Sequence, residues 1–213
     1  MRYGTEHKAA TRQQVIETAA RRFRADGIEA TGIAALMAEA GLTHGGFYAH
    51  FPSKEALVQE TIATALEQTT AKLAAITEKA EGGSADGKVL EKFIRNYLSP
   101  AHRDSTAKGC AVPALAAEIA RHPVKTRNAF TRELQKLLHM IGDLLPPRLP
   151  PAKRQETALA LFSTLTGSLQ LARAVSDPDL SRHFLEQGIA AARVLVAAAE
   201  TTPAKHRKPR RSV

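Results

Sequence analysis

The sequence predicts an all-α fold, on the strength of three observations. Apolar residues recur at helical spacing through most of the 213 residues. No stretch alternates apolar and polar residues in the way that a half-buried strand does. Pro123, Pro151 and Pro178 each stand where a periodic segment begins, a position at which the missing N–H group costs nothing. We therefore expect packed helices, in a chain long enough to bury a sizeable core.

A first helix is expected over residues 9–26, after an arm at residues 1–8 that we expect to be mobile. Val15 and Phe23 belong to an apolar stripe on this helix that would face the core. Gly27 is expected to end the helix, because glycine readily takes the positive φ of a helix terminus. The arginines predicted to project outward are Arg12, Arg21, Arg22 and Arg24.

Residues 31–57 contain two short helices that meet at a glycine. Leu36 and Met37 contribute to the apolar face of the first. Gly41 supplies the positive φ that a sharp turn between helices needs, and Thr43 is expected to cap the second helix with its hydroxyl. A helix, a tight glycine turn and a short helix with a polar start form the helix-turn-helix layout, which reads the DNA major groove.

A long helix is expected next, over residues 53–79. Pro52 forces the chain out of helical geometry at Phe51, and Ser53 can cap the new helix. Such a helix is long enough to connect a DNA-reading head to the rest of the chain. The glycine-rich segment 81–87 is predicted to be a flexible boundary between two functional halves.

Helical periodicity continues after this boundary, with no internal repeat. Residues 146–151 contain four prolines and are predicted to form a stiff connector. Residues 203–213 are charged and poor in apolar residues, so we expect them to be disordered. Further helices are expected at residues 88–100, 110–121, 123–145, 152–176 and 179–199.

The net charge of +9 is weak evidence for nucleic-acid binding because of where it lies. Residues 1–60 hold seven basic and seven acidic residues, and residues 61–202 hold 18 and 14. The tail at 203–213 holds five basic residues and no acidic residue. The prediction of DNA binding therefore depends on the helix-turn-helix motif and not on the overall charge.

The remaining composition predicts a cytoplasmic protein. One cysteine cannot form an internal disulfide, which fits a reducing compartment. No apolar run approaches the ~20 residues that a membrane helix needs, and the amino terminus has no apolar signal segment. We therefore expect no membrane partner.

The motif residues also resemble a known family. Gly41-Leu42, the run Phe-Tyr-Ala-His-Phe at residues 47–51, and Ser53-Lys54-Glu55 are similar to the amino-terminal signature of TetR-type transcriptional regulators. The resemblance covers about residues 10–58. Beyond that point the chain matches the family in its helical layout alone.

This resemblance implies an architecture and a function. Residues 1–58 would be a helix-turn-helix DNA-binding head, residues 59–202 a helical ligand-sensing and dimerisation domain, and residues 203–213 a basic tail. The protein would bind a near-palindromic double-stranded DNA operator as a homodimer and act as a repressor that responds to a small-molecule effector.

The resemblance also implies which residues contact DNA. Tyr48, His50 and Lys54 match the phosphate-contacting positions of the family, and Lys54 lies in a first helical turn, where free N–H groups already favour phosphate. The alternative is that Tyr48 packs and that His50 is a solvated surface residue. Phe47 and Phe51 are expected to be core. The predicted DNA-binding residues are Thr31, Thr43, His44, Gly45, Gly46, Tyr48, His50 and Lys54.

Three positions depart from the family pattern. Gly32 stands where a threonine commonly caps the helix and touches a phosphate, and Thr31 is the available substitute. Ala34 stands where a polar residue is common, which removes a contact to a base or to the DNA backbone. Met37 stands where a small residue is usual, four residues before the turn glycine, so its side chain must bend into a tight helix crossing.

A ligand pocket is predicted in the second half of the chain. Cys110 follows a glycine and begins a predicted helix, with Lys108 and His102 upstream. Its thiol has two interpretations: a reactive group with a lowered pKa, or a buried and inert side chain. Apolar and aromatic residues near it could line the pocket or could simply be core. The candidate pocket residues are Tyr97, Cys110, Phe130, His139, Met140 and Phe162.

The last two long helices carry apolar stripes, and we expect them to pair with their copies in a four-helix bundle. One helix-turn-helix reads a single half-site, so a dimer is the usual solution. The alternative is that these stripes are internal core. Gly167 and Gly188 would allow close helix contact. The stripes consist of Leu161, Phe162, Leu165 and Leu169 on one helix and Phe184, Leu185, Ile189, Leu195 and Val196 on the other.

Two other classes of function fit the sequence less well. An enzyme is not expected, because the sequence has no common catalytic motif and His102, His122 and His139 lack the spacing of metal ligands. We thus predict no catalytic residue, no bound metal and no cofactor. A non-specific architectural DNA-binding protein that uses its basic tail is the alternative to a sequence-specific regulator.

Overall fold

The computed structural model describes residues 2–78 and 87–201, and these ranges contain helices and no strand, which confirms the all-α prediction. None of the helices in these ranges combines the length and the apolar character that crossing a bilayer requires. The helices are α1 (Arg2–Asp26), α2 (Ile33–Glu39), η1 (His44–Ala49), α3 (Lys54–Glu78), α4 (Lys88–Tyr97), α5 (Pro100–Asp104), η3 (Thr106–Lys108), α6 (Ala111–Ile119), α7 (Val124–Asp143), α8 (Pro151–Ala174) and α9 (Pro178–Thr201).

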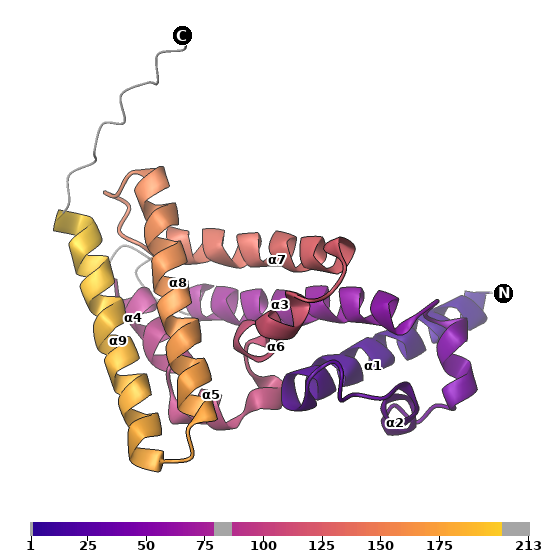
Figure 1. Ribbon diagram of the computed structural model, residues 1–213. Coiled ribbons are helices and arrows are strands. Elements are labelled where there is room, and N and C mark those ends of the chain that lie inside the picture. The colour runs from indigo at the N-terminus through magenta and orange to yellow at the C-terminus, as the bar shows by residue number, and fades with distance from the viewer. Residues whose placement is uncertain (1, 79–86, 202–213) are drawn as a thin grey trace, which may run out of the picture.

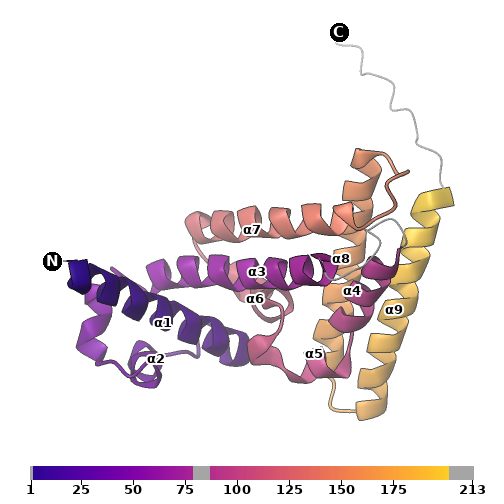
Figure 2. The ribbon, with the colours of Figure 1, turned by 180° about the vertical axis from the view of Figure 1, so that it is seen from behind.

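The molecule is elongated, with its two ends built from different helices. Figure 1 shows α1 and α2 at one end and the antiparallel pair α8 and α9 at the other. Helices α3 and α7 lie side by side between these ends, as the view from behind in Figure 2 also shows. Thr126 and His122 both contact Glu55, so the start of α7 lies beside the start of α3 and the two helices run in the same direction.

The helix-turn-helix forms as predicted around its glycine. Gly41 has a φ of +71°, and the Leu42 N–H donates to the Met37 carbonyl oxygen over 2.8 Å, which closes α2 with a Schellman-type turn. Phe47 and Phe51 are fully buried, as expected. The segment after the turn, η1, is a 3₁₀ helix, so the residues predicted to read DNA lie on a short and tightly wound helix.

Two predictions about the helices differ from the structure, and two others fall largely outside the described residues. Helix α1 begins at Arg2 and includes residues 2–8, where we expected an arm, because no proline precedes residue 9 to interrupt the helix. Helix α4 ends at Tyr97, since the Ser99 hydroxyl accepts a hydrogen bond from the His102 N–H and begins a separate helix, α5. The predicted flexible boundary and the predicted disordered tail fall largely on residues 79–86 and 202–213, outside the described residues.

The apolar stripe of α8 belongs to the internal core. Leu161, Phe162, Leu165 and Leu169 are all buried within the single chain, as is Leu185 on α9. These residues cannot also pair with a second copy, so the alternative interpretation is correct for them. The other residues of the predicted α9 stripe are partly exposed: Phe184, Ile189, Leu195 and Val196.

Candidate DNA interface and ligand pocket

Two stacked phenylalanines fix the recognition segment η1 to the body of the head. The rings of Phe47 and Phe51 lie 5.6 Å apart at 29°, and both side chains are fully excluded from solvent. Phe23 of α1 is also in this core. Because Phe47 occupies the inner face of η1, the remaining residues of this short helix are turned toward solvent.

Tyr48 is the prominent exposed side chain of this segment, with 62% of its surface accessible. Its ring meets the ring of Phe47 edge-on at 5.2 Å, and that of His44 at 6.4 Å. Thr43, His44 and Gly45 are exposed beside it, and Gly46 is half-buried. The segment therefore presents a supported aromatic hydroxyl and an imidazole on one outward surface, as contact with a DNA backbone would require.

His50 and Lys54 lie at the edge of this surface. His50 is half-buried, and its ring Nδ1 is buried without a hydrogen-bond partner. The Lys54 ammonium donates to the Glu29 carbonyl oxygen over 3.4 Å, which connects the start of α3 to the turn between α1 and α2. Ser53 caps that turn as predicted, by accepting a hydrogen bond from the Ala56 N–H.

The hydrogen bonding of two threonines among the predicted DNA-binding residues, Thr31 and Thr43, differs from the expectation. Thr31 is buried, and its hydroxyl donates to the Gly27 carbonyl oxygen over 2.7 Å. Its hydroxyl is thus engaged within the chain, which does not favour Thr31 as the substitute for the phosphate contact missing at Gly32. Thr43 precedes η1 without a side-chain capping bond, so its exposed hydroxyl is not used within the chain in the predicted way.

The departure at Met37 has a structural compensation. Met37 is fully buried, and its Cε lies 3.9 Å from the point that a Cβ on Gly46 would occupy. A flexible thioether can fill such an irregular gap. The large residue in α2 and the small one in η1 therefore fit each other across the turn.

The arginines of α1 are mostly engaged within the protein. Arg12 pairs with Glu60, and Arg21 and Arg22 pair with Glu39. Arg24, which was predicted to project outward, is instead buried. Its guanidinium donates to the Ala107 carbonyl oxygen over 2.8 Å and to Gln68 over 3.2 Å, so it connects the head to the body.

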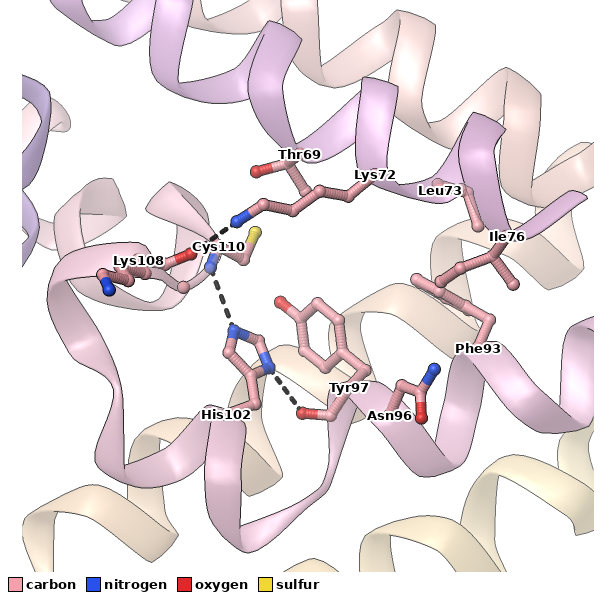
Figure 3. A pocket seen from close by; sticks show the side chains of 11 residues that line it. Thr69, Lys72, Leu73, Ile76, Phe93, Asn96, Tyr97, His102, Lys108 and Cys110 are labelled. Carbon is pink, nitrogen blue, oxygen red and sulfur yellow. Dashed lines mark hydrogen bonds between the residues drawn. The ribbon is translucent and has the colours of Figure 1, made fainter. Parts of the chain in front are cut away.

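A cavity of about 160 Å³ lies between α3, α4 and the segment that follows α5 (Figure 3). Its apolar wall and its few polar groups are typical of a small-molecule site. No group of three His, Cys, Asp or Glu side chains in the described ranges is arranged to hold a metal ion. The lining residues are Thr69, Lys72, Leu73, Ile76, Phe93, Asn96, Tyr97, His102, Lys108, Gly109 and Cys110.

Two of the six predicted pocket residues, Tyr97 and Cys110, line this cavity. Phe162 packs behind it, with its ring 5.7 Å from that of Tyr97. Phe130, His139 and Met140 are on α7 and do not line it. Helix α3 also contributes Thr69 and Lys72, which were not predicted because periodicity presented this helix as a plain connector.

The environment of Cys110 differs from the reactive interpretation. The His102 Nε2 accepts a hydrogen bond from the Cys110 N–H over 3.0 Å, and its Nδ1–H donates to the Tyr97 carbonyl oxygen over 2.7 Å. Both ring nitrogens are thus occupied by the backbone, and burial lowers the pKa of His102. The thiol is itself buried, and burial raises its pKa although Tyr97, Thr69 and Arg173 act in the opposite direction.

We expect Cys110 to react slowly. At pH 7 the thiol should be alkylated by iodoacetamide at least tenfold more slowly than free cysteine, because burial raises its pKa and the thiolate is the nucleophile. The rate should keep rising with pH above about 8.5, the pKa of an ordinary cysteine. The protein in urea should react at the normal rate. Since the chain has one cysteine, labelling reports on Cys110 alone, and a rate above that of free cysteine would contradict this prediction.

Hydrogen bonds connect the pocket wall to the head. The Lys72 ammonium donates to the Lys108 carbonyl oxygen over 2.6 Å, one residue from the carbonyl that Arg24 binds. On α6, the Glu118 carboxylate accepts from the N–H groups of Ile28 and Glu29 over 2.9 and 3.1 Å, at the turn between α1 and α2. The segment at residues 107–118 therefore contacts both the cavity and the end of α1.

Comparison with known proteins identifies the amino-terminal region. The model of a family described as bacterial regulatory proteins, tetR family, matches residues 15–61. A curated relative from Mycobacterium tuberculosis, an uncharacterised HTH-type transcriptional regulator, is 26% identical over 78% of this chain and 86% of its own length. A second, YxaF of Bacillus subtilis, bears the same description and is 29% identical over 54% of this chain and 61% of its own length.

Solved structures support the fold beyond the matched region. The reduced form of NemR from Escherichia coli has a TM-score of 0.72 at 19% identity, over 87% of this chain and 96% of that one. A TetR-family regulator from Cytophaga hutchinsonii has a TM-score of 0.75 at 17% identity, over 92% and 98%. At such identities the likeness concerns the fold, and it extends over the carboxy-terminal helices that the family model does not cover.

Proposed function

Because the chain belongs to the TetR family of DNA-binding transcriptional regulators, we propose that it is a ligand-responsive repressor that binds a near-palindromic operator as a homodimer. The observation that carries this proposal is the recognition segment: an outward surface made by His44, Tyr48 and Lys54 on a rigid support of buried phenylalanines. The head would comprise residues 1–58 and the sensing and dimerisation domain residues 59–202, although α3 runs without interruption across residue 58.

The DNA contacts follow from exposure and charge. The Tyr48 hydroxyl and the Lys54 ammonium would bind phosphates on either side of the groove, and the free N–H groups at the start of α3 would add to this. Thr43, His44 and the backbone of Gly45 and Gly46 would face the bases. With two glycines in this segment, close approach of the backbone would replace some of the long donors on which direct readout usually relies.

Coupling between ligand and DNA would pass through the segment at residues 107–118. A molecule in the cavity would contact Lys72 and Cys110, and thereby the carbonyl groups that Lys72 and Arg24 bind. Movement of this segment would shift Glu118 and the turn that it holds at Ile28. A ligand needs ~1–3 kcal/mol of differential affinity to move such an equilibrium appreciably.

The dimer would use the outward faces of α8 and α9. Leu159 and Leu171 on α8 and Leu180 and Val194 on α9 are between 43% and 67% exposed, which is unusual for large apolar residues in a single chain. Gly167 lies between the two α8 leucines, four residues before Leu171, and a Cβ there would meet no heavy atom from another part of the chain within 4 Å. The two pairs of helices could thus approach closely as a four-helix bundle.

A gel shift with the full chain tests the proposal. DNA that spans the protein's own promoter should give a discrete complex at near-physiological salt, and scrambled DNA of the same length should bind at least a hundredfold more weakly. Expression of a reporter gene driven by that promoter should rise when the protein is absent, since the proposed role is repression.

The architectural alternative makes the opposite prediction. It requires equal binding to both DNAs, a uniform loss of affinity with salt, and loss of binding when residues 203–213 are deleted. This set of results would reject the sequence-specific regulator. Binding that survives the deletion and still discriminates between the two DNAs would reject the architectural alternative.

A further inference from the structure

The cavity has one apolar end and one cationic end. Figure 3 shows Phe93 and Ile76 on one side, while Lys72 reaches over the cavity toward Cys110 and the Tyr97 hydroxyl points to the same end. The described lining contains no aspartate or glutamate. A ligand that fills this cavity would therefore place an apolar body against the aromatic side chains and a polar group near the Lys72 ammonium.

Three cations near this end are satisfied by neutral oxygens. Lys72 donates to the Lys108 carbonyl oxygen, and Arg24 to the Ala107 carbonyl oxygen and to the amide of Gln68. Arg173 donates to the carbonyl oxygens of His102 and Arg103 over 2.7 and 3.1 Å. Burial lowers the pKa of all three groups, so their positive charge is partly desolvated. Carbonyl oxygens satisfy hydrogen bonds but leave the net charge in place.

Little negative charge opposes these cations. The Cys110 thiol is neutral at physiological pH, since burial raises its pKa. His102 is neutral as well and adds no charge of either sign. Burial lowers the pKa of Arg173 and the carboxylate of Asp104 acts to raise it, but Asp104 is exposed and forms an ion pair with Arg103. An ammonium has three donors, of which Lys72 uses one on Lys108, so it can still bind an anion directly.

The size of the cavity limits the ligand. An apolar protein cavity of roughly 150 Å³ holds benzene, and this one has about 160 Å³. We propose that the effector is a small aromatic molecule with one negative charge, of the size of benzoate, whose anionic group binds Lys72 and whose ring lies against Phe93 and Tyr97. This inference rests on the proposed function in taking the cavity as the effector site.

Three probes of similar shape and different charge test the ligand class. The full chain, without DNA, is titrated calorimetrically with benzoate, benzamide and benzamidine, which are anionic, neutral and cationic. Benzoate should bind at least tenfold more tightly than benzamide, and benzamidine should show no binding. Equal affinities for benzoate and benzamide, or no binding of benzoate, would overturn the proposal.

Variants of two lysines test whether the Lys72 ammonium is the group that binds the benzoate carboxylate. Lys72→Met should weaken benzoate binding at least tenfold and change benzamide binding less than twofold, while Lys72→Arg should restore most of the benzoate affinity. Lys92→Met is the matched control, because it removes the same charge from an exposed position on α4 outside this cavity. An equal loss in the two methionine variants would show a general charge effect and reject Lys72 as the binding group.

The same preparation separates this inference from the proposed function. If benzoate binds, it should dissociate the protein from promoter DNA, and the gel shift should show a loss of the complex. Specific promoter binding without any binding of benzoate overturns the ligand class and leaves the regulator in place. Benzoate binding by a protein that does not discriminate between promoter and scrambled DNA retains the ligand class and rejects the regulator.

Discussion

Replacing Tyr48 with alanine is expected to leave the protein folded and to weaken operator binding at least tenfold, whereas alanine at the adjacent Phe47 is expected to unfold the head. Tyr48 is 62% exposed, and its hydroxyl projects from the recognition segment. Surface substitutions of this kind usually change stability by less than ~0.5 kcal/mol. Phe47 is fully buried against Phe51, and a buried Phe→Ala change typically costs ~3–5 kcal/mol.

The two neighbours are each other's control, since one contributes a contact surface and the other the core beneath it. Urea denaturation followed by circular dichroism measures the stability of each variant, and a gel shift with promoter DNA measures its affinity. Phe47→Leu should recover most of the stability lost in Phe47→Ala, because it retains much of the buried volume. Wild-type operator affinity in Tyr48→Ala would reject Tyr48 as a DNA contact, and a large loss of its stability would show that it serves packing.

Replacing Gly167 with arginine is expected to convert the proposed dimer to a monomer and to weaken operator binding at least a hundredfold. A Cβ at this position would meet no heavy atom from another part of the chain within 4 Å, so we expect the monomer to fold normally. In the proposed four-helix bundle the same side chain would enter the contact between two copies of α8. A monomer reads one half-site, and it loses the contribution of the second recognition segment.

Gly188 provides the contrasting variant. A Cβ there would lie 2.5 Å from the Ser168 Oγ and 2.8 Å from a methyl group of Leu98, so Gly188→Ala should destabilise the monomer by overpacking, by ~1–3 kcal/mol. Sedimentation velocity should show a monomer for Gly167→Arg, whereas urea denaturation should show a loss of stability for Gly188→Ala. A Gly167→Arg protein that remains dimeric would place the interface elsewhere.

The head was largely predictable from the sequence because its geometry is local. Gly41 needs a positive φ, Pro52 must end a helix and Phe47 repeats with Phe51 at helical spacing, and each of these signals acts within a few residues. The internal hydrogen bond of Thr31, whose hydroxyl donates to the Gly27 carbonyl oxygen, was not predicted. A threonine hydroxyl can donate to a carbonyl oxygen four residues earlier or point outward to a partner. The spacing of residues in the sequence does not decide between these two orientations.

The pocket and the dimer face depended on contacts between distant segments. Lys72 and Cys110 are 38 positions apart along the chain and line one cavity, and Arg24 crosses from α1 to the carbonyl oxygen of Ala107. Periodicity shows that α8 has an apolar stripe, but it does not show whether another helix of the same chain covers that stripe. Gly167 and Gly188 looked alike in the sequence, and the packing of α9 against α8 separated them.

The sequence by itself determined the helices, the glycine turn and the family, since these depend on backbone preferences and short-range spacing. The tertiary structure decided which charges and surfaces are free. Arg24 became an internal connector because a carbonyl oxygen from a distant segment accepts a hydrogen bond from its guanidinium. Cys110 became a shielded thiol because α3 and α4 pack around it and burial raises its pKa. Burial is a property of the assembled helices, and no single segment of sequence contains it.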